Sequence, residues 1–411
     1  MKPRFIVPKE KVLRGDATKL KVGAGIQILP NSSRVLQQWG LRTSLERFAT
    51  KPACVNFMHW KGIPISSLDL RASASQYPGT FYWDFHRANL HTCLLDRAVE
   101  LGAKIRCRAR VTAVRAGAEG AIAVLEGGEG IEADLVVGAD GINSRLRELM
   151  LGRPDPPTPT GDLAYRLLLS TSDMLKDPEL APLVTHPQVN YWLGPGAHVV
   201  NYVLRGGELF NMVLLVPDDM PAGGAPTLEG NVVEMRKLYE GWDPRIGKLL
   251  GLCESVYKWR LCIRQPMESW SHASGSWTML GDAVHATLPY LASGAGMSLE
   301  DGAVLGECLA RISSRSAASK QRALHVYERC RKGRTEMVVR RGSLQQRLYH
   351  LPDGPEQEER DRQMRMVPPP AGEALAWRDP GLAPVLLGYD AVRDVEEHWS
   401  KEGKRLPLCR L

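Results

Sequence analysis

The chain has 411 residues, of which 44% are hydrophobic and 24% charged, and its formal net charge is +7. This balance is that of an ordinary globular protein, and the length predicts two or three lobes whose core needs neither disulfides nor a structural metal. No stretch of about eighteen apolar residues is present, and the first part of the chain lacks an apolar run, so we expect neither a membrane span nor a signal peptide.

The first part of the chain alternates helix and strand patterns. Apolar residues at helical spacing predict a short helix over 30–41 and a second helix over 88–101. Residues 121–137 predict a hairpin with a glycine-rich turn. The hairpin leads into the apolar strand 135–137, which ends at the sequence Gly-Ala-Asp-Gly.

A proline-rich segment, 152–161, interrupts this alternation and marks a domain boundary. From 162 to about 265, short alternating segments predict an antiparallel sheet. A buried strand around 276–282 and a long helix over 296–312 then return to the earlier pattern. The tail after residue 346 is rich in proline and charge, and we expect it to wrap the outside of the molecule.

The fold class that follows is α/β, with a nucleotide-binding domain that a substrate domain splits in sequence. We assign residues 1–155 and 266–345 to the nucleotide-binding domain. Residues 156–265 form the predicted substrate domain, an antiparallel α+β layer, and 346–411 form a C-terminal tail.

Charge and cysteine patterns argue against two kinds of site. The densest basic run, 329–341, is interrupted by Glu336 and is typical of a solvated helix face, so no nucleic-acid partner is predicted. The eight cysteines show no metal-ligand spacing, which predicts no metal site and a protein of a reducing compartment, the cytoplasm. Cys93 and Cys308 lie in apolar helical patterns and are predicted to be buried packing residues.

The strongest chemical signal is residues 281–309, GDAVHATLPYLASGAGMSLEDGAVLGECL. A strand ends at Gly281-Asp282, and a glycine-rich turn at 294–296 opens a helix. A carboxylate at a strand end can accept hydrogen bonds from ribityl or ribose hydroxyls. Small residues at a helix start let backbone N–H groups approach an anionic ligand. Although Gly-Asp alone would be only a turn, the full segment indicates a nucleotide-type cofactor.

This segment closely resembles the second FAD motif of the salicylate hydroxylase-like flavin monooxygenases, whose wider family includes para-hydroxybenzoate hydroxylase. Residues 133–147, ADLVVGADGINSRLR, look like the family's DG motif, and residues 22–41 look like the segment after its second strand. Residues 85–98, FHRANLHTCLLDRA, resemble its HRxxL helix start. The resemblance covers nearly the whole chain and extends to FAD monooxygenases of fungal secondary metabolism. It implies a Rossmann-like FAD-binding domain with an inserted antiparallel-sheet substrate domain.

Carried over residue by residue, the resemblance implies that FAD is contacted by Gly23 or Ala24, Arg87, Asp282 and Ala295. His285 lies close to this loop in sequence, and as a lone histidine it is interpreted as structural.

Two segments of the substrate domain supply candidate catalytic residues. Residues 161–169 resemble a stretch where related hydroxylases place a phenolate-binding arginine, here Arg166. A cation inside an apolar strand also needs an anionic partner. Residues 194–211 resemble the strand that faces the substrate ring, and strand alternation puts His198 and Tyr202 on one face, where they could share a pocket. Tyr202 is the preferred hydrogen-bond partner of the substrate oxygen; the alternative is that it is only a packed aromatic residue of the sheet.

The resemblance also implies the reaction. NADPH, bound transiently, reduces FAD; molecular oxygen adds at C4a; and the hydroperoxyflavin transfers an electrophilic oxygen to an electron-rich ring. Arg166 would lower the pKa of a substrate phenol by favouring its charged form, and Tyr202 would orient it. We therefore expect an FAD- and NADPH-dependent hydroxylase of a phenolic small molecule, with a polyketide-derived phenol as the finer expectation.

The chain departs from the family pattern at its N-terminus. Family members begin with a strand, a GxGxxG loop and a helix, followed by a second strand that ends in a ribose-binding Glu. Here residues 12–25 align with the second-strand region, and Arg14 stands at the position of that Glu. We expect an N-terminally truncated chain that binds FAD poorly, either because a first exon or start site was missed or because the truncation is real.

Two other functions remain open at this point. The chain is a pseudoenzyme or binding protein that keeps the fold without turnover, or it is a flavin epoxidase. Arg166 argues against the epoxidase, because an alkene needs no phenolate partner. Neither the substrate nor the oligomeric state follows from the sequence.

Overall fold

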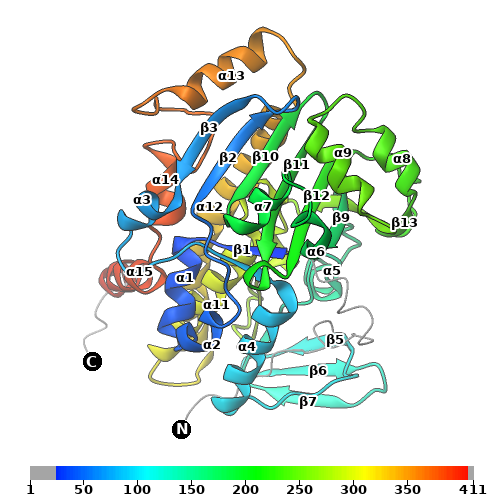
Figure 1. Cartoon of the computed structure of the whole chain (residues 1–411). Coiled ribbons are helices and arrows are strands. Elements are labelled where there is room, and N and C mark those ends of the chain that lie inside the picture. The colour runs from blue at the N-terminus through cyan, green and yellow to red at the C-terminus, as the bar shows by residue number, and fades with distance from the viewer. Residues whose placement is uncertain (1–24, 406–411) are drawn as a thin grey trace.

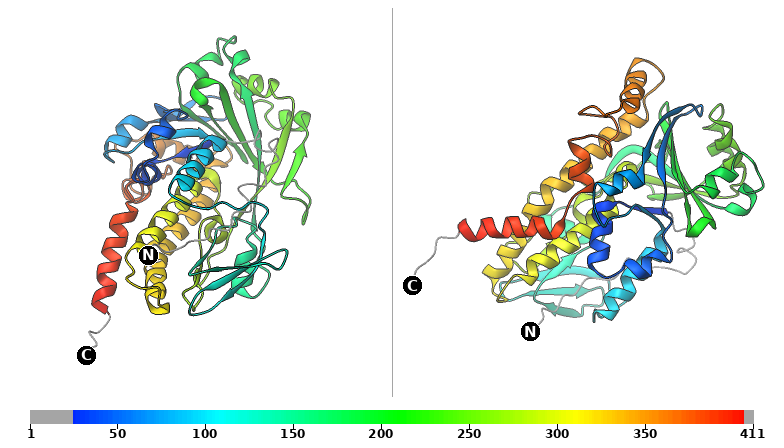
Figure 2. Two further views of the ribbon diagram at one scale, coloured as in Figure 1. Left: turned by 90° about the horizontal axis from the view of Figure 1, so that it is seen from below. Right: turned by 60° about the vertical axis from the view of Figure 1, so that its left-hand side comes forward.

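A computed structural model describes residues 25–405 of the chain. An eight-stranded sheet forms one end of the molecule, and a smaller three-stranded sheet lies at the opposite end. Long helices pass between the two sheets (Figures 1 and 2). Gly23, Ala24 and Arg14 lie outside the described residues. Among the described residues, no helix combines the length and apolar character needed to cross a membrane.

The eight-stranded sheet has the order β13-β14-β9-β12-β11-β10-β2-β3. All its neighbours are antiparallel except β10 and β2, which are parallel. The predicted antiparallel layer is therefore present in β9 to β14, and two strands from the first part of the chain extend it. The strands are β2 (Cys54–His59), β3 (Pro64–Asp69), β9 (Thr158–Ser170), β10 (Val189–Gly194), β11 (Ala197–Leu204), β12 (Leu209–Pro217), β13 (Thr227–Gly230) and β14 (Val256–Ile263).

Strand alternation gives this sheet two buried faces. The outer face, with Leu163, Trp192 and Phe210, packs on the short helices α6 (Thr171–Met174), α7 (Ala181–Thr185), α8 (Val232–Lys237) and α9 (Pro244–Gly251). The inner face, with Tyr191 and Tyr202, packs on η3 (Pro289–Leu291), α12 (Ala317–Tyr349) and C-terminal segments. The candidate site lies on this inner face.

The second region joins segments that are far apart in sequence. Strand β8 (Val136–Gly138) pairs in parallel with β15 (Trp277–Met279). Helices α5 (Arg145–Leu151), α10 (Asp282–His285) and α11 (Gly294–Ala310) follow these strands, and the three-stranded sheet is formed by β5 (Val111–Ala116), β6 (Ala121–Leu125) and β7 (Gly130–Ala133). The predicted hairpin is confirmed as β6–β7, the predicted long helix as α11, and the α/β fold class is observed.

A two-stranded layer lies between these regions. Strand β1 (Gly25–Ile28) pairs antiparallel with β4 (Trp83–His86). One face of the pair packs on α1 (Pro30–Gln38), α2 (Arg42–Glu46) and α4 (Arg87–Glu100) through apolar residues. The other face carries Gly25, Gln27, Asp84 and His86, and it meets the inner face of the large sheet.

The C-terminal part of the chain corrects two sequence predictions. The tail does not simply wrap the outside, because Leu375 and Trp377 are buried in the core beneath the large sheet. The basic run 329–341 is not a wholly solvated face either, because it lies within the 33-residue helix α12 and Arg331 is fully buried there. Helices α3 (Leu70–Ser75), α13 (Pro355–Arg365), α14 (Leu382–Leu387) and α15 (Ala391–Arg405) complete the fold.

Candidate active site

The candidate site begins where the β1–β4 pair touches the large sheet. The backbone N–H of Gly25 donates a 2.7 Å hydrogen bond to Oδ1 of Asn211 on β12. A Cβ at Gly25 would lie 2.5 Å from Cε2 of Tyr202, so a larger residue would collide with the tyrosine ring. Glycine is therefore needed here for close approach of the backbone.

Tyr202 and Arg166 lie on the same face of the sheet, as the resemblance implied. Tyr202 is opposite Asn211 in the β11–β12 register, and Arg166 is opposite Val213, two residues further along β12. The Arg166 guanidinium lies 5.1 Å from the ring centroid of Trp259. Among residues 25–405, Arg166 forms no ion pair with a carboxylate, and its enclosed Nε has no hydrogen-bond partner.

Four buried polar atoms around Tyr202 have no partner within the protein. They are Oδ2 of Asp84, Nδ1 of His86, Nε of Arg166 and Nδ2 of Asn211. Buried polar groups are normally hydrogen-bonded, so several unpaired donors and acceptors at one junction indicate a ligand site. The site lies where the β1–β4 pair meets the large sheet. It therefore combines residues of the first part of the chain with residues of the predicted substrate domain, 156–265.

Burial keeps most of these groups neutral. It raises the pKa of Asp84 to about 8, against the opposing hydrogen bond from Gln27. It also lowers the pKa of His86 and raises that of Tyr202 well above its ordinary value. Arg166 stays cationic, although burial and the neighbouring charge of Arg87 lower its pKa to about 10. Arg166 therefore gives the site positive charge, which favours an anionic ligand.

The residues predicted to contact FAD surround a helix N-terminus. Helix α11 begins at Gly294, its N-cap Ser293 makes no side-chain capping bond, and its first turn carries no acidic residue. Ala295 is half-buried in that turn, and Asp282 is exposed at the first position of α10. Free backbone N–H groups at a helix start and an exposed carboxylate suit the anionic ring edge and the ribityl hydroxyls of a flavin.

Arg87 occupies the first position of α4 and is exposed, directly after the buried strand β4. Its charge acts on both Arg166 and Tyr202. Arg87 therefore lies close to the proposed substrate residues. The donor set near α11 and α4 fits the isoalloxazine and ribityl portions of FAD.

A buried charge network anchors the N-terminal half of α11. Oδ2 of Asp301 accepts hydrogen bonds from the Gly281 backbone (2.8 Å) and from His285 Nε2 (2.5 Å). Arg331 contacts both Asp301 Oδ1 and Glu300 Oε2 at 2.7 Å. The structural interpretation of His285 is thus supported, and Arg331 acts inside the core.

The expectation that His198 shares a pocket with Tyr202 is wrong. His198 lies on the predicted face, but its Nδ1 is 2.7 Å from His350 Nε2, and the ring packs edge-on against Tyr290 and Tyr349. These side chains cover His198, whereas Tyr202 packs on Gly25. Alternation places side chains on a face, but it does not show what covers them.

Sequence reasoning missed Arg147, which ties the DG segment to the FAD loop. This fully buried arginine donates to the backbone oxygens of Ala283 (3.3 Å) and Val284 (3.2 Å) and pairs with Asp155 at 2.6 Å. It also missed Asp84, although a carboxylate between aromatic residues in a strand pattern is a usable signal.

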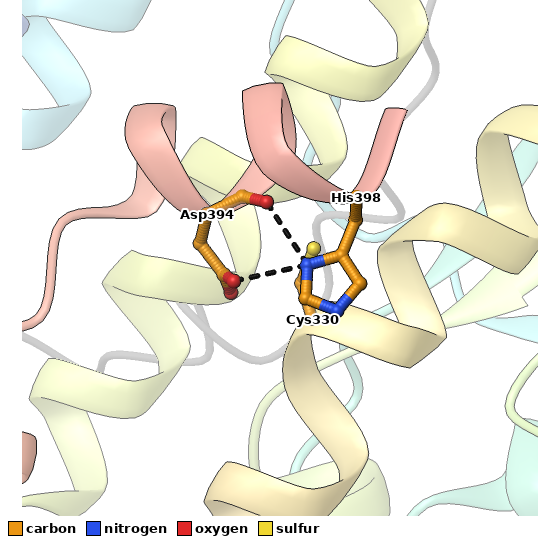
Figure 3. A group of neighbouring side chains, drawn as sticks. All are labelled: Cys330, Asp394 and His398. Atoms are coloured by element: carbon orange, nitrogen blue, oxygen red, sulfur yellow. Dashed lines mark hydrogen bonds and ion pairs between the residues drawn. The ribbon is translucent and has the colours of Figure 1, made fainter. Parts of the chain in front are cut away.

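A separate cluster brings Cys330, Asp394 and His398 together, with potential metal-ligand atoms within 4.8 Å of one another (Figure 3). His398 Nδ1 lies 3.0 Å from the Asp394 carbonyl oxygen and 3.1 Å from Oδ1, so this nitrogen acts as a donor. Burial and Asp394 raise the pKa of the Cys330 thiol, which stays protonated. The two bonds between His398 and Asp394 lie within α15, and the hydrogen bond between the Cys330 thiol and Asp394 joins α15 to α12.

With the geometry described, comparison with known proteins defines the class. The FAD binding domain family matches residues 15–216, and the chain belongs to the FAD-dependent aromatic monooxygenases. It is 40% identical over 383 residues to FAD-dependent monooxygenase OpS4 of Beauveria bassiana (strain ARSEF 2860), an alignment that covers 90% of this chain and 87% of that protein.

Two further similarities agree with this class. The chain is 35% identical over 362 residues to 3-amino-4-hydroxybenzoate 2-monooxygenase PtmB3 of Streptomyces platensis, covering 86% of this chain and 85% of that protein. Its fold matches a salicylate hydroxylase substrate complex with a TM-score of 0.75 at 23% identity, covering 92% and 90% of the two chains. The predicted membership of a salicylate hydroxylase-like FAD monooxygenase group is confirmed.

Proposed function

We propose that the protein hydroxylates a phenolic small molecule that binds as its phenolate, with Arg166 as the ionic partner and Tyr202 as the orienting hydrogen-bond donor. The observation that carries this proposal is the half-buried Arg166, which has no carboxylate partner among the described residues. A cation in such surroundings is costly unless an anion accompanies it. A phenolate is such an anion, and it is a stronger carbon nucleophile than the neutral phenol.

The protonation states support these roles. Tyr202 keeps its phenolic proton because burial, with Asp84 and Tyr191 nearby, raises its pKa well above the ordinary value. It can therefore donate to an anionic oxygen. Arg166 remains charged at neutral pH and favours the ionised substrate.

We propose that Arg87, Asp282, Ala295 and, from the sequence resemblance, Gly23 or Ala24 would hold FAD, which would supply the activation of molecular oxygen. We propose NADPH as the transient reductant and a polyketide-derived phenol of secondary metabolism as the natural substrate. This chain's residues bind and orient the ring.

The test uses two probes that differ by one amino group, 3-amino-4-hydroxybenzoate and 4-hydroxybenzoate. With FAD saturating, each is titrated into wild type, into Arg166→Met and into the matched control Arg329→Met, which changes an exposed arginine on α12. Ultraviolet difference spectra report whether the bound phenol is ionised. At a pH below the pKa of the free phenol, we expect wild type and Arg329→Met to show the spectrum of a bound phenolate. Arg166→Met should not show it. A neutral bound phenol in all three proteins would contradict the role of Arg166.

The second candidate, a binding protein without turnover, is favoured by Arg14 at the position of the family's ribose-binding Glu. NADPH consumption without a hydroxylated product from any phenol, in protein that binds FAD, would support it. An epoxidase would instead convert an alkene and be indifferent to Arg166→Met.

A further inference from the structure

We infer that Asp84 forms a specificity subsite of this monooxygenase, which pairs with one small hydroxyl or amino substituent on the aromatic substrate. This inference rests on the proposed function and extends it to a second polar contact on the ring. It is carried by a cavity, by an unpaired buried carboxyl oxygen in its wall, and by the position of that carboxyl on the face of β4 that packs on the sheet at Tyr202.

The cavity lies behind the β1–β4 pair and encloses about 10 Å³, which is room for one water-sized group. Gln27 and Asp84 are its polar walls. Tyr82, Trp83 and Trp377 contribute aromatic walls. The space is too small for a ring, so it suits a single substituent that projects from a ring held elsewhere.

Three residues that line this cavity have a buried polar atom without a partner, and Asp84 is the carboxyl among them; the other two are the indole Nε1 atoms of Trp83 and Trp377. The Asp84 side chain is 1% exposed, its Oδ1 accepts a 3.1 Å bond from Gln27 Nε2, and its Oδ2 has no partner. An unpaired buried carboxyl oxygen is costly, and a ligand group that pairs with it removes that cost. A hydroxyl or amino group can pair with the carboxyl, and a methyl group or a hydrogen cannot.

The subsite adjoins the proposed phenolate position. Asp84 and His86 lie on the face of β4 that meets the large sheet, and His86 is opposite Gly25, which touches Tyr202. Asp84 is close enough to Tyr202, and to Tyr191 of the neighbouring strand, to contribute to the raised pKa of both phenols. In the arrangement that we infer, one ring has its phenolate oxygen at Tyr202 and Arg166 and a second substituent at Asp84.

The test measures binding of the probe pair to FAD-saturated protein by calorimetry, so that it does not depend on turnover. In wild type we expect tighter binding of the amino probe. Asp84→Leu should weaken binding of the amino probe roughly tenfold to a hundredfold and change binding of 4-hydroxybenzoate little. Asp84→Asn keeps a hydrogen-bonding group and should retain part of the preference, which also tests the subsite if the leucine variant does not fold. Asp96→Leu, at an exposed site on α4, is the matched control.

Each remaining outcome decides the matter. Equal loss of both probes in Asp84→Leu, or no loss of either, would overturn the subsite; the second result would mean that the cavity holds only a water. If wild type binds both probes as phenolates but without preference, the subsite fails and the proposed function stands. If wild type binds neither probe, the proposed function fails and the subsite fails with it.

Discussion

Arg331→Met removes the buried cation that holds α11 in place. Arg331 is fully buried, and its two ion pairs, with Glu300 and Asp301, are both 2.7 Å long. Removing one member of a buried ion pair leaves the partner charge uncompensated, which typically costs about 3–5 kcal/mol. The substitution should therefore lower the free energy of unfolding strongly.

The remaining contacts limit the loss. Asp301 keeps His285 and the Gly281 N–H, and Glu300 keeps Arg334 at 2.8 Å and Asn31 at 2.6 Å. We therefore expect the lower part of the range, about 3 kcal/mol. Adding Asp301→Asn to Arg331→Met removes one uncompensated charge and should recover about 1 kcal/mol.

The assay is urea unfolding followed by circular dichroism at pH 7. Arg329→Met is the control, because it makes the same change at an exposed position of the same helix and should stay within about 0.5 kcal/mol of wild type. If Arg331→Met costs no more than this control, the interpretation of the network as a structural anchor is wrong.

Three further predictions concern single residues. Gly25→Ala places a methyl group 2.5 Å from the Tyr202 ring and should cost about 1–3 kcal/mol of stability, whereas Gly247→Ala, with open space around it, should cost nothing; equal effects would disprove the close packing. Burial alone would raise the pKa of Asp301, but His285 and Arg331 lower it to about 2. The ionised carboxylate should therefore contribute about 2 kcal/mol to the free energy of unfolding above pH 3.8, and this contribution should be lost as the pH falls through 2. Acid unfolding curves of Asp301→Asn should lack this component, and an unchanged pH dependence would refute it. Burial raises the pKa of Asp84 from 3.8 to about 8, so wild type should lose stability as the pH rises between these values. The free energy of unfolding of Asp84→Asn, relative to that of wild type, should therefore grow by on the order of 4 kcal/mol from pH 5 to pH 8. A pH-independent difference would show that the carboxyl is not held neutral.

Local patterns predicted the elements whose signals lie within one segment. The helices α1, α4 and α11 and the hairpin β6–β7 appear where their periodicities and glycine stops placed them, because an amphipathic pattern is read within a few turns. Cys93 and Cys308 are buried for the same reason.

Burial of charged residues could not be predicted in this way. Arg331 looked like part of a solvated basic face because its partners Glu300 and Asp301 lie on another helix, and the Asn31 that completes the network is 269 positions from Glu300. Trp377 belongs to a segment rich in proline and charge, yet it packs edge-on against Tyr191 of the large sheet. These contacts depend on tertiary packing.

Some residues of the candidate site could likewise be predicted from the sequence, and others could not. Arg166 and Tyr202 came from resemblance and strand alternation, and the structure places them on one face of the sheet. Asn211 is the neighbour of Tyr202 across the β11–β12 pair, whereas His86 and Asp84 join the site only because β1 and β4 pack against that face, a contact between distant segments.

The central claim is that this chain is an FAD-dependent hydroxylase of a phenol. The most direct test supplies FAD-saturated protein with NADPH, 3-amino-4-hydroxybenzoate and isotopically labelled molecular oxygen, and measures the mass of the product. We expect a hydroxylated ring that carries one labelled oxygen atom in wild type and in Arg329→Met, and far less of it in Arg166→Met. A product whose new oxygen comes from water, or equal product from Arg166→Met, would contradict the account.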